Sequence, residues 1–322
     1  RNALVLTRRM PTFAGWREKA AGRPGKLPPP AMHVNAVSKR VASCIGARVR
    51  ISGPNRIRYQ AACRGQAGAL LAEHPVVVAD AVAGVLLAQL LDGAAEEDKL
   101  AANKNIFQNP DMLDALIGIY ERNVQGYPAT AVLPYSQALS RFPAHLQQCD
   151  MESNGKTVNR FGEPVDYPTG PVIFGEPGTN GQHSFYQLLH QGSDIVPLQF
   201  IGFRNSQLGV DVDIENSTSQ QKLCANVAAQ IVAFACGKKD DNLNKNFKGH
   251  RPSSIITGDE LTPASLGALL AHFENKIMFQ GFVWNLNSFD QEGVQLGKVL
   301  AKRVLAHNTD GALKAYSDLL NI

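Results

Sequence analysis

Hydrophobic and polar positions follow two different patterns along this chain. Residues 1–60 show no sustained period and are rich in Pro, Gly and Arg, so we predict no regular element there. From about Ala79 the apolar positions suit buried or amphipathic helices. The pattern predicts its first two helices over residues 79–92 and 110–122, and Pro110 suits the first turn of the second.

After residue 130, short apolar runs alternate with amphipathic segments. The runs predicted as strands cover residues 130–133, 170–175, 196–203, 253–257 and 279–286. The segments predicted as helices cover residues 136–152, with Ser136 as a candidate cap, and 183–191, 219–236, 263–276, 291–307 and 310–320. Strands that alternate with helices of this length indicate parallel β-α-β units. We therefore predict an α/β fold, a three-layer α/β/α sandwich with a mostly parallel sheet, behind an irregular N-terminal segment.

Charge divides the chain at nearly the same place. Residues 1–72 carry fourteen Lys and Arg residues against one acid, Glu18, whereas the remaining 250 residues carry eighteen basic and twenty-seven acidic ones. Such a basic stretch is typical of a nucleic-acid or membrane-surface arm, or of an Arg-rich organelle transit peptide. A third interpretation, which we favour because the chain begins with Arg1, is that the stretch is not native coding sequence. We predict residues 1–78 as an atypical basic leader, disordered or non-native, and residues 79–322 as one domain that ends in C-terminal helices.

Composition argues against several classes of protein. The chain has 44% hydrophobic residues, which suits a soluble core, and no apolar run approaches the ~18 residues of a membrane-spanning helix. Five cysteines, an odd number without a CxxC spacing, argue against a zinc site or a disulfide scaffold and for a reducing compartment. We therefore expect a cytoplasmic protein without a metal, with organelle import as the alternative should the basic leader be native.

Two polar segments in the middle of the chain could carry chemistry. Residues 175–183 (GEPGTNGQH) lie between a predicted strand and a predicted helix, where free backbone N–H groups can cradle an anion. An ordinary tight turn explains the same glycines. Residues 151–156 (MESNGK) lie at the end of a predicted helix. Gln148 and Glu152 are four residues apart, so both side chains project from one face of this helix. A solvated surface acid is the alternative for Glu152.

A third polar segment lies near the end of the chain, at residues 288–298 (SFDQEGVQLGK). Ser288 or Asp290 can cap the predicted helix, on which Gln291 and Lys298 belong to one polar stripe. Two glycines within that helix cost about 1 kcal/mol each relative to Ala, which favours a close approach by another molecule. The solvated face of an ordinary helix is the alternative for this stripe. The residues alone indicate a soluble α/β domain with three loop clusters, without a Ser-His-Asp or metal-ligand spacing.

Together, the three segments resemble the signature sequences of glucose-6-phosphate isomerases. Residues 175–192 (GEPGTNGQHSFYQLLHQG) are very similar to the family's long signature. Residues 147–156 (QQCDMESNGK) resemble the segment upstream of it, and residues 284–298 (WNLNSFDQEGVQLGK) resemble the C-terminal signature. The resemblance runs from about residue 88 to the end of the chain and implies a sugar-isomerase-type (SIS) domain.

The resemblance implies reversible isomerisation of glucose 6-phosphate to fructose 6-phosphate through a cis-enediol, a step of glycolysis and gluconeogenesis. It implies Glu152 as the general base, and Lys298 as a residue that serves ring opening. His183 would also assist ring opening, reaching the site of the neighbouring subunit in a homodimer. Gln148 and Gln291 would line the sugar and phosphate. This chemistry needs one carboxylate and flanking donors but no metal and no organic cofactor.

The resemblance stops at the N-terminal side. Residues 1–87 match neither the family's phosphate-binding loop nor its Gly-Gly-Arg segment. The alternative is therefore a catalytically inactive fragment that retains a sugar-phosphate-binding or dimerisation module, or, as a third hypothesis, a sugar-phosphate-sensing regulator. Under the isomerase hypothesis we expect no nucleic-acid or membrane partner. We expect Glu152 and Lys298 to converge on one cleft while His183 faces a surface that a partner completes.

Overall fold

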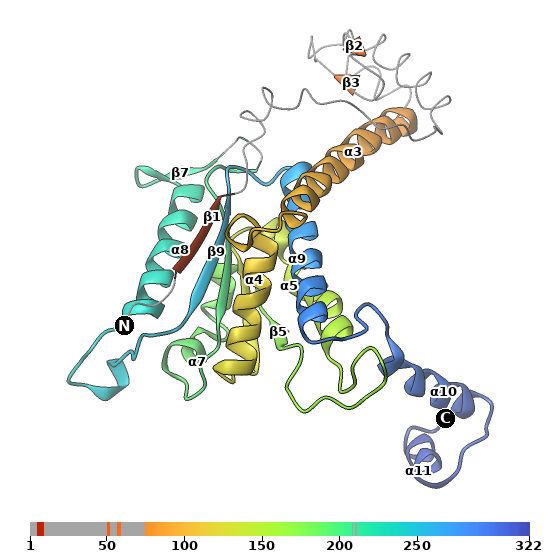
Figure 1. The fold of residues 1–322 in the computed structure, drawn as a ribbon. Coiled ribbons are helices and arrows are strands. Elements are labelled where there is room, and N and C mark those ends of the chain that lie inside the picture. Colours follow the sequence, from red (N-terminus) through yellow and green to blue (C-terminus); the bar gives the residue numbers. More distant parts are fainter. Residues whose placement is uncertain (1–4, 10–49, 52–56, 59–74, 208, 210) are drawn as a thin grey trace. The chain divides into compact units, whose positions relative to one another are not determined.

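The computed structural model describes residues 5–9, 50–51, 57–58, 75–207, 209 and 211–322, with side chains from residue 83 onward (Figure 1). It forms two compact units. The first contains Arg1–Met10, Glu97–Leu261 and Leu270–Ile322, and the second contains Pro11–Glu96 and Thr262–Leu269.

The regular elements follow the order that the hydrophobic pattern predicts. The α-helices of the described residues are α3 (Pro75–Ala101), α4 (Pro110–Ile119), α5 (Phe142–Leu146), α6 (Gly178–Gly181), α7 (Tyr186–Gln191), α8 (Ser219–Cys236), α9 (Pro263–Val283), α10 (Gln295–Leu305) and α11 (Gly311–Leu319). Two π-helical turns are η2 (Tyr120–Val124) and η4 (Gln147–Glu152). The 3-10 turns are η1 (Ile106–Gln108), η3 (Gln137–Leu139), η5 (Leu243–Lys245) and η6 (Glu292–Val294).

Five parallel strands form the central sheet, in the spatial order β1-β9-β6-β4-β5. They are β1 (Val5–Arg9), β4 (Ala129–Pro134), β5 (Val172–Phe174), β6 (Leu198–Phe203) and β9 (Ser253–Gly258). The register places Ala131 beside Leu198, and Leu198 beside Ser253. Two small antiparallel pairs complete the strands, β2 (Arg50–Ile51) with β3 (Ile57–Arg58) and β7 (Asp213–Ile214) with β8 (Ser217–Thr218).

Helices cover both faces of this sheet, as Figure 1 shows for α7 and α8 on one face and α4 and α5 on the other. Successive strand residues point to opposite faces. In β6, Leu198 and Phe200 therefore enter the core beneath α7 and α8, whereas Gln199 faces α4 and α9. The core on the α7–α8 side is apolar and includes Leu133, Tyr186 and Phe234. The predicted three-layer α/β/α sandwich with a parallel sheet is confirmed.

One predicted strand is wrong. Residues 279–286 were expected to be extended, but α9 continues to Val283. The apolar run FQGFVW fits either element by hydrophobicity alone. The spacing of the buried residues fits a helix, because Ile277, Gln280 and Trp284 are all nearly fully buried and lie three to four residues apart.

Two predicted helices are interrupted. Residues 136–152 form η3, α5 and η4 instead of one helix, and Ser136 makes no side-chain capping hydrogen bond. Residues 183–191 contain a helix only from Tyr186, at the start of α7. Short irregular breaks of this kind leave the hydrophobic period nearly unchanged, so the sequence pattern does not reveal them.

Among its described residues, the basic leader contains three strands that the sequence does not predict, β1, β2 and β3. β1 pairs in parallel with β9 over five residues, at the edge of the sheet. This pairing differs from the prediction that residues 1–60 contain no regular element. Besides the three strands, residues 75–78 of the leader are described and begin α3. The rest of the leader lies outside the described residues, and the boundary at residue 78 remains a prediction.

In the second unit, two helices approach each other closely. A Cβ on Gly93 would lie 1.8 Å from the Ala264 carbonyl oxygen, and a Cβ on Gly267 would lie 1.9 Å from the Leu90 carbonyl oxygen. Only glycine allows backbones to pack so closely at these two positions.

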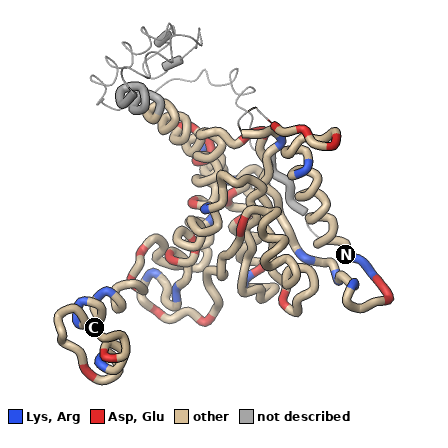
Figure 2. The backbone as a smooth tube through the Cα atoms, turned by 180° about the vertical axis from the view of Figure 1, so that it is seen from behind, with Lys and Arg blue, Asp and Glu red and all other residues tan. Residues whose placement is uncertain are grey.

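Two predictions from composition concern the distribution of charge and the absence of a membrane-spanning helix. Acidic and basic residues are interspersed along the body from α3 onward (Figure 2). Within the part of the chain that the structure describes, no helix has the length and apolar character required to cross a membrane.

Candidate functional site

The Gly-rich loop after β5 lies against the carboxyl end of β4. A Cβ on Gly175 would lie 1.8 Å from the Val132 carbonyl oxygen, and a Cβ on Gly178 would lie 2.0 Å from the Tyr135 ring. Both positions therefore require glycine for close packing. Ligands of open α/β sheets bind at the carboxyl ends of the strands. The loop consequently lies at the edge of the sheet where a ligand site is expected.

Polar contacts with α8 hold this loop. The Tyr135 hydroxyl donates to Asn226 Oδ1 at 3.0 Å, and Gln182 Nε2 donates to the same oxygen at 2.5 Å. The hydroxyls of Tyr135 and Tyr186 lie 3.4 Å apart, and burial raises the pKa of both phenols. The two tyrosines are therefore neutral hydrogen-bonding groups that fix the turn before α7.

His183 lies on that turn, between α6 and α7, rather than on a helix as the sequence predicts. Its side chain is exposed, and its backbone N–H donates to the Asn180 carbonyl at 3.0 Å. Among the described residues, no hydrogen bond or ion pair joins His183 to Glu152 or Lys298. The His183 imidazole is therefore exposed to solvent.

Gln148 and Glu152 lie together on η4, a π-helical turn directly before the loop that leads to β5. π-Helical turns are rare and occur frequently at functional sites. Gln147 anchors this turn, because its Nε2 donates to the Ile173 carbonyl of β5 at 3.0 Å. Gln148 is exposed and Glu152 is half-buried, whereas Asp150 points into the core. The turn thus presents the first two residues while its opposite side packs inward.

The segment of Glu152 is joined to the start of the C-terminal signature. Lys156 Nζ donates to the Glu152 carbonyl at 2.9 Å and to the Asp290 carboxylate at 2.5 Å. Ser288 Oγ donates to Asn154 Oδ1 at 2.6 Å. Two predicted signature segments that are more than 130 residues apart therefore meet in the fold.

Gln291 directly follows Asp290, before η6, and Lys298 lies on α10. Both side chains are exposed, and within the described part of the chain no hydrogen bond or ion pair links Lys298 to Glu152. The convergence of these two side chains remains a prediction. The expected cap is wrong: Ser288 and Asp290 bond Asn154 and Lys156 instead, and α10 has no side-chain cap.

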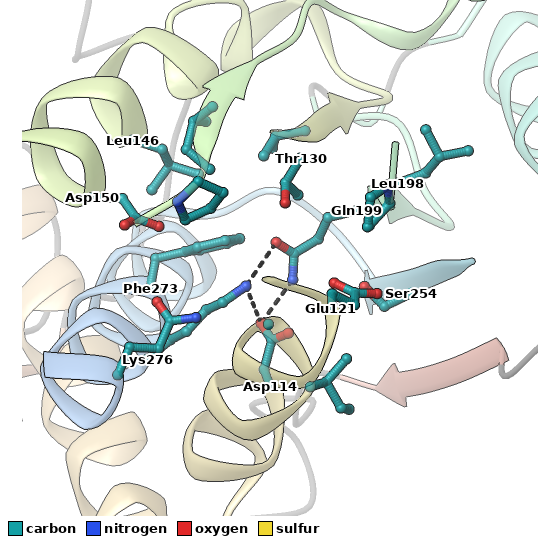
Figure 3. Close-up of a pocket in the computed structure, with 17 residues that line it drawn as sticks. Asp114, Glu121, Thr130, Leu146, Asp150, Leu198, Gln199, Ser254, Phe273 and Lys276 are labelled. Atoms are coloured by element: carbon teal, nitrogen blue, oxygen red, sulfur yellow. Dashed lines mark hydrogen bonds and ion pairs between the residues drawn. The ribbon is translucent and has the colours of Figure 1, made fainter. Parts of the chain in front are cut away.

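A buried polar network, which the sequence does not predict, lies between the sheet and the helices α4 and α9 (Figure 3). Lys276 Nζ lies 3.1 Å from Asp114 Oδ2 and donates to Gln199 Oε1 at 3.2 Å. Gln199 Nε2 closes the triangle by donating to the same Asp114 oxygen at 2.7 Å. His272 Nε2 contacts this oxygen as well, at 3.1 Å. Three donors therefore surround one carboxylate.

The charges of this network stabilise one another. Burial alone would raise the pKa of Asp114, but the Lys276 charge and the His272 hydrogen bond hold it well below its usual range. Burial alone would lower the pKa of His272, but hydrogen bonds to Asp111, Asp114 and Glu97 raise it to about 10. His272 is therefore an imidazolium at neutral pH, enclosed by carboxylates.

A small cavity of about 30 Å³ borders this network, room for one or two water molecules. Asp150 and Gln280 line it, and neither Asp150 Oδ1 nor Gln280 Oε1 has a hydrogen-bond partner among the residues that the structure describes. Burial raises the pKa of Asp150 to about 6 and that of Glu121 to about 7, although Lys276 lowers both. The cavity is too small for a sugar phosphate.

Three residues of the network offer metal-ligand atoms. The nearest such atoms of Glu97, Asp111 and His272 all lie within 4.8 Å of one another. His272 Nδ1, however, contacts carboxylate oxygens of both Asp111 and Glu97, and Nε2 contacts Asp114. An imidazolium with two N–H donors satisfies this arrangement, whereas a metal would need Nδ1 without its proton. The geometry therefore fits an ion-pair network better than a metal site.

The sequence did contain a signal for this network. On α9, His272, Lys276 and Gln280 recur every four residues, and on α4, Asp111 and Asp114 are three apart. Both sets project from faces that carry buried apolar residues. Polar residues of complementary charge at core positions predict pairing between helices, but not which helices pair.

Comparison with known proteins identifies the body of the chain. The family model described as phosphoglucose isomerase matches residues 78–318. A glucose-6-phosphate isomerase of Treponema denticola is 73% identical over 230 residues, which are 71% of this chain and 44% of the relative. One of Chlamydia pneumoniae is 59% identical over 217 residues, 67% of this chain and 41% of the relative.

A solved structure agrees with these relatives. The crystal structure of a glucose-6-phosphate isomerase from Chlamydia trachomatis has a TM-score of 0.69 and 49% identity, and covers 72% of this chain and 45% of that chain. The chain therefore spans less than half the length of the relatives it matches. Residues 78–318 include the helix α3 through most of α11 and all three signature segments. On this match, the chain belongs to the phosphoglucose isomerase family.

Proposed function

We propose that this chain catalyses the reversible isomerisation of glucose 6-phosphate and fructose 6-phosphate through a cis-enediol, in the cytoplasm and without a metal or organic cofactor. The observation that carries the proposal is the η4 turn. It presents Glu152 beside Gln148, and Lys156 ties it to the segment that continues into Gln291. Family membership supplies the substrate class.

In the proposed reaction, the Glu152 carboxylate removes the proton from C2 of the open-chain aldose and returns it to C1. Electrons shift from the C2–H bond to form the enediol, while the carbonyl oxygen at C1 receives a proton. As C1 takes up the proton from Glu152, the C2 hydroxyl loses its own proton and becomes the ketose carbonyl, so the net change is one hydrogen from C2 to C1 and one from O2 to O1. A half-buried carboxylate on a short, anchored turn suits this role, because it is positioned yet accessible. Gln148 and Gln291 would donate hydrogen bonds to the sugar and phosphate, and Lys298 would serve ring opening.

We propose that the active form is a homodimer in which His183 of one subunit enters the site of the other. The exposure of His183 and the lack of a bond to Glu152 among the described residues support this arrangement. An imidazole that acts in its own subunit would be expected near its own base. The proposed partners are therefore the sugar phosphates and a second copy of the chain, with no nucleic acid and no membrane.

A coupled assay of the purified 322-residue chain tests the proposal. Fructose 6-phosphate is supplied, and glucose 6-phosphate formation is followed through reduction of NADP by its dehydrogenase. Turnover that is lost in E152Q and retained in E274Q, a control at an exposed glutamate of α9, is the expected result. A folded chain without turnover would overturn the proposal. Isothermal titration with fructose 6-phosphate would then show whether it is an inactive binding module.

Subunit complementation tests the shared site. The variants E152Q and H183N should each be inactive, but a 1:1 mixture that is dissociated and reassembled should recover about one quarter of wild-type activity. Half of the dimers are then mixed, and each mixed dimer contains one intact site. No recovery in a mixture that forms mixed dimers would contradict the contribution of His183 across the interface.

A further inference from the structure

We propose that Lys156 and Asp290 are positioning residues. Their ion pair fixes the η4 turn, which carries Glu152, relative to the C-terminal signature segment, residues 284–298. The inference rests on the proposed isomerase function and deepens it. Neither residue is expected to touch the sugar. Their role is to keep Glu152 and Gln291, which are 139 positions apart in the sequence, at a fixed separation.

Lys156 bonds to both segments at once. Its ammonium donates to the Glu152 carbonyl oxygen at 2.9 Å, to the Asp290 carbonyl oxygen at 2.9 Å and to the Asp290 carboxylate at 2.5 Å. An ammonium has three N–H donors, so this set uses all of them. A shift of the loop would therefore act directly on the backbone of the residue proposed as the base.

Asp290 is oriented by a second partner. Asn287 Nδ2 donates to its other carboxylate oxygen at 2.7 Å. The Lys156 and Asp290 side chains are 16% and 36% exposed, so the pair is screened less than a fully solvated one. The hydrogen bond from Lys156 also holds the pKa of Asp290 below its usual range. The pair is thus charged at neutral pH and fixed in direction.

A second contact reinforces the same junction from the buried side. Asn154 is fully buried, with Nδ2 donating to the Ile277 carbonyl at 2.9 Å and Oδ1 accepting from Ser288 Oγ at 2.6 Å. Gly281 makes room for this hydroxyl, because a Cβ there would lie 2.0 Å from Ser288 Oγ. The Asn154 side-chain amide therefore joins the segment after η4 to both α9 and the loop that contains Ser288.

The backbone of the loop is held in an unfavourable conformation between these anchors. Phe289 has a φ of 66°, although its side chain has no local hydrogen bond to offer. The left-handed conformation is unfavourable for a bulky residue and persists only where neighbouring contacts enforce it. The Ser288 and Asp290 contacts flank Phe289 directly. They are the contacts that enforce the turn from which Gln291 emerges.

Kinetic measurements on K156M, K156R and D290N test the proposal. K156M and D290N should lower kcat/KM by about 10–100-fold, mostly in kcat, because small displacements of reacting groups are costly. The double variant should be no worse than either single variant, since both remove the same pair. K156R should recover part of the activity. Effects confined to KM, additive losses or no loss at all would overturn the inference.

A matched control is available on α11, where Lys314 Nζ lies 2.9 Å from Asp318 in an exposed pair. K314M should leave the kinetic constants unchanged. Hydrogen exchange of residues 284–298 gives a readout that does not need activity. Exchange should accelerate in K156M and D290N but not in K314M. Unchanged exchange in the two variants would overturn the inference even if the chain had no isomerase activity, which would refute only the proposed function.

Discussion

Two polar regions of this domain differ in how their residues are held. The network of Asp114, Gln199, His272 and Lys276 is buried between sheet and helices, with each group bonded to the others. The signature residues Gln148, Glu152, His183, Gln291 and Lys298 are exposed or half-buried on turns and on α10.

Strongly shifted pKa values therefore do not by themselves locate a catalytic site. Such shifts arise wherever charges are buried together, including ion-pair networks with a structural role. The network borders a cavity of about 30 Å³, which cannot admit the substrate class of this family. The residues that the family resemblance assigns to catalysis are exposed or half-buried. Access, rather than electrostatic perturbation, separates the two regions.

The largest expected effect distinguishes the regions by activity. E152Q should reduce isomerase turnover by about 10²–10⁴-fold, because an amide cannot accept the proton from carbon. Its Tm should change little, since Glu152 is half-buried and its carboxylate has no hydrogen-bond partner among the described residues. The coupled assay and a thermal melt measure both quantities. A large fall in the Tm of E152Q together with normal turnover would show that Glu152 contributes to stability and not to catalysis.

The next effect distinguishes them by stability. K276M should destabilise the fold by about 3–5 kcal/mol, because it removes one of the two cations that lie 3.1 Å from the buried Asp114 carboxylate. The Tm should fall by roughly 10 °C. K302M, at an exposed lysine of α10, is the control and should melt like the wild type. Equal melting of K276M and K302M would show that the network contributes nothing to stability.

The pH dependence of stability should report His272. Its pKa is raised to about 10 in the folded state, so its contribution is complete below the unfolded value of 6.5 and is lost as pH rises through 10. The loss between pH 6.5 and 10 should be on the order of a few kcal/mol in urea titrations. H272Q should show a flatter profile over this window. Parallel profiles of the two proteins would contradict the charged state assigned to His272.

The smallest effect should come from Asp150. Because its pKa is raised to about 6, its stabilising contribution is present below pH 3.8 and is lost as pH rises through 6. D150N should therefore raise the Tm by a few °C at pH 8, where the wild type must bury an ionised carboxylate. D166N, at an exposed site, should not. A lower Tm for D150N would mean that the Asp150 charge is compensated in the native state.

Much of the fold could be predicted from single segments. The pattern located α8 at its observed bounds and β6 and β9 within two residues, because long apolar faces and β-branched runs are local signals. It failed at residues 279–286, where an apolar run belongs to the end of α9. It also missed β1, since pairing at a sheet edge depends on a partner strand 248 positions away.

The candidate site shows the same division. The sequence motifs alone were enough to propose five site residues, and the family match covers all of them: Gln148, Glu152, His183, Gln291 and Lys298. The sequence also placed the Gly-rich loop between a strand and a helix. It could not reveal that η4 is π-helical, or that Ser288 and Asp290 bond distant residues instead of capping a helix. These outcomes depend on which side chains the fold brings within hydrogen-bonding distance.

Local sequence information was sufficient for the family, the parallel α/β class and the residues proposed to carry the chemistry, because each depends on contiguous motifs or local periodicity. Only the tertiary structure decided that Lys156 joins Glu152 to Asp290, and that Lys276 and His272 converge on Asp114. Such pairings connect residues that are more than 130 positions apart. They are set by the packing of whole helices on the sheet, and short-range sequence patterns do not specify them.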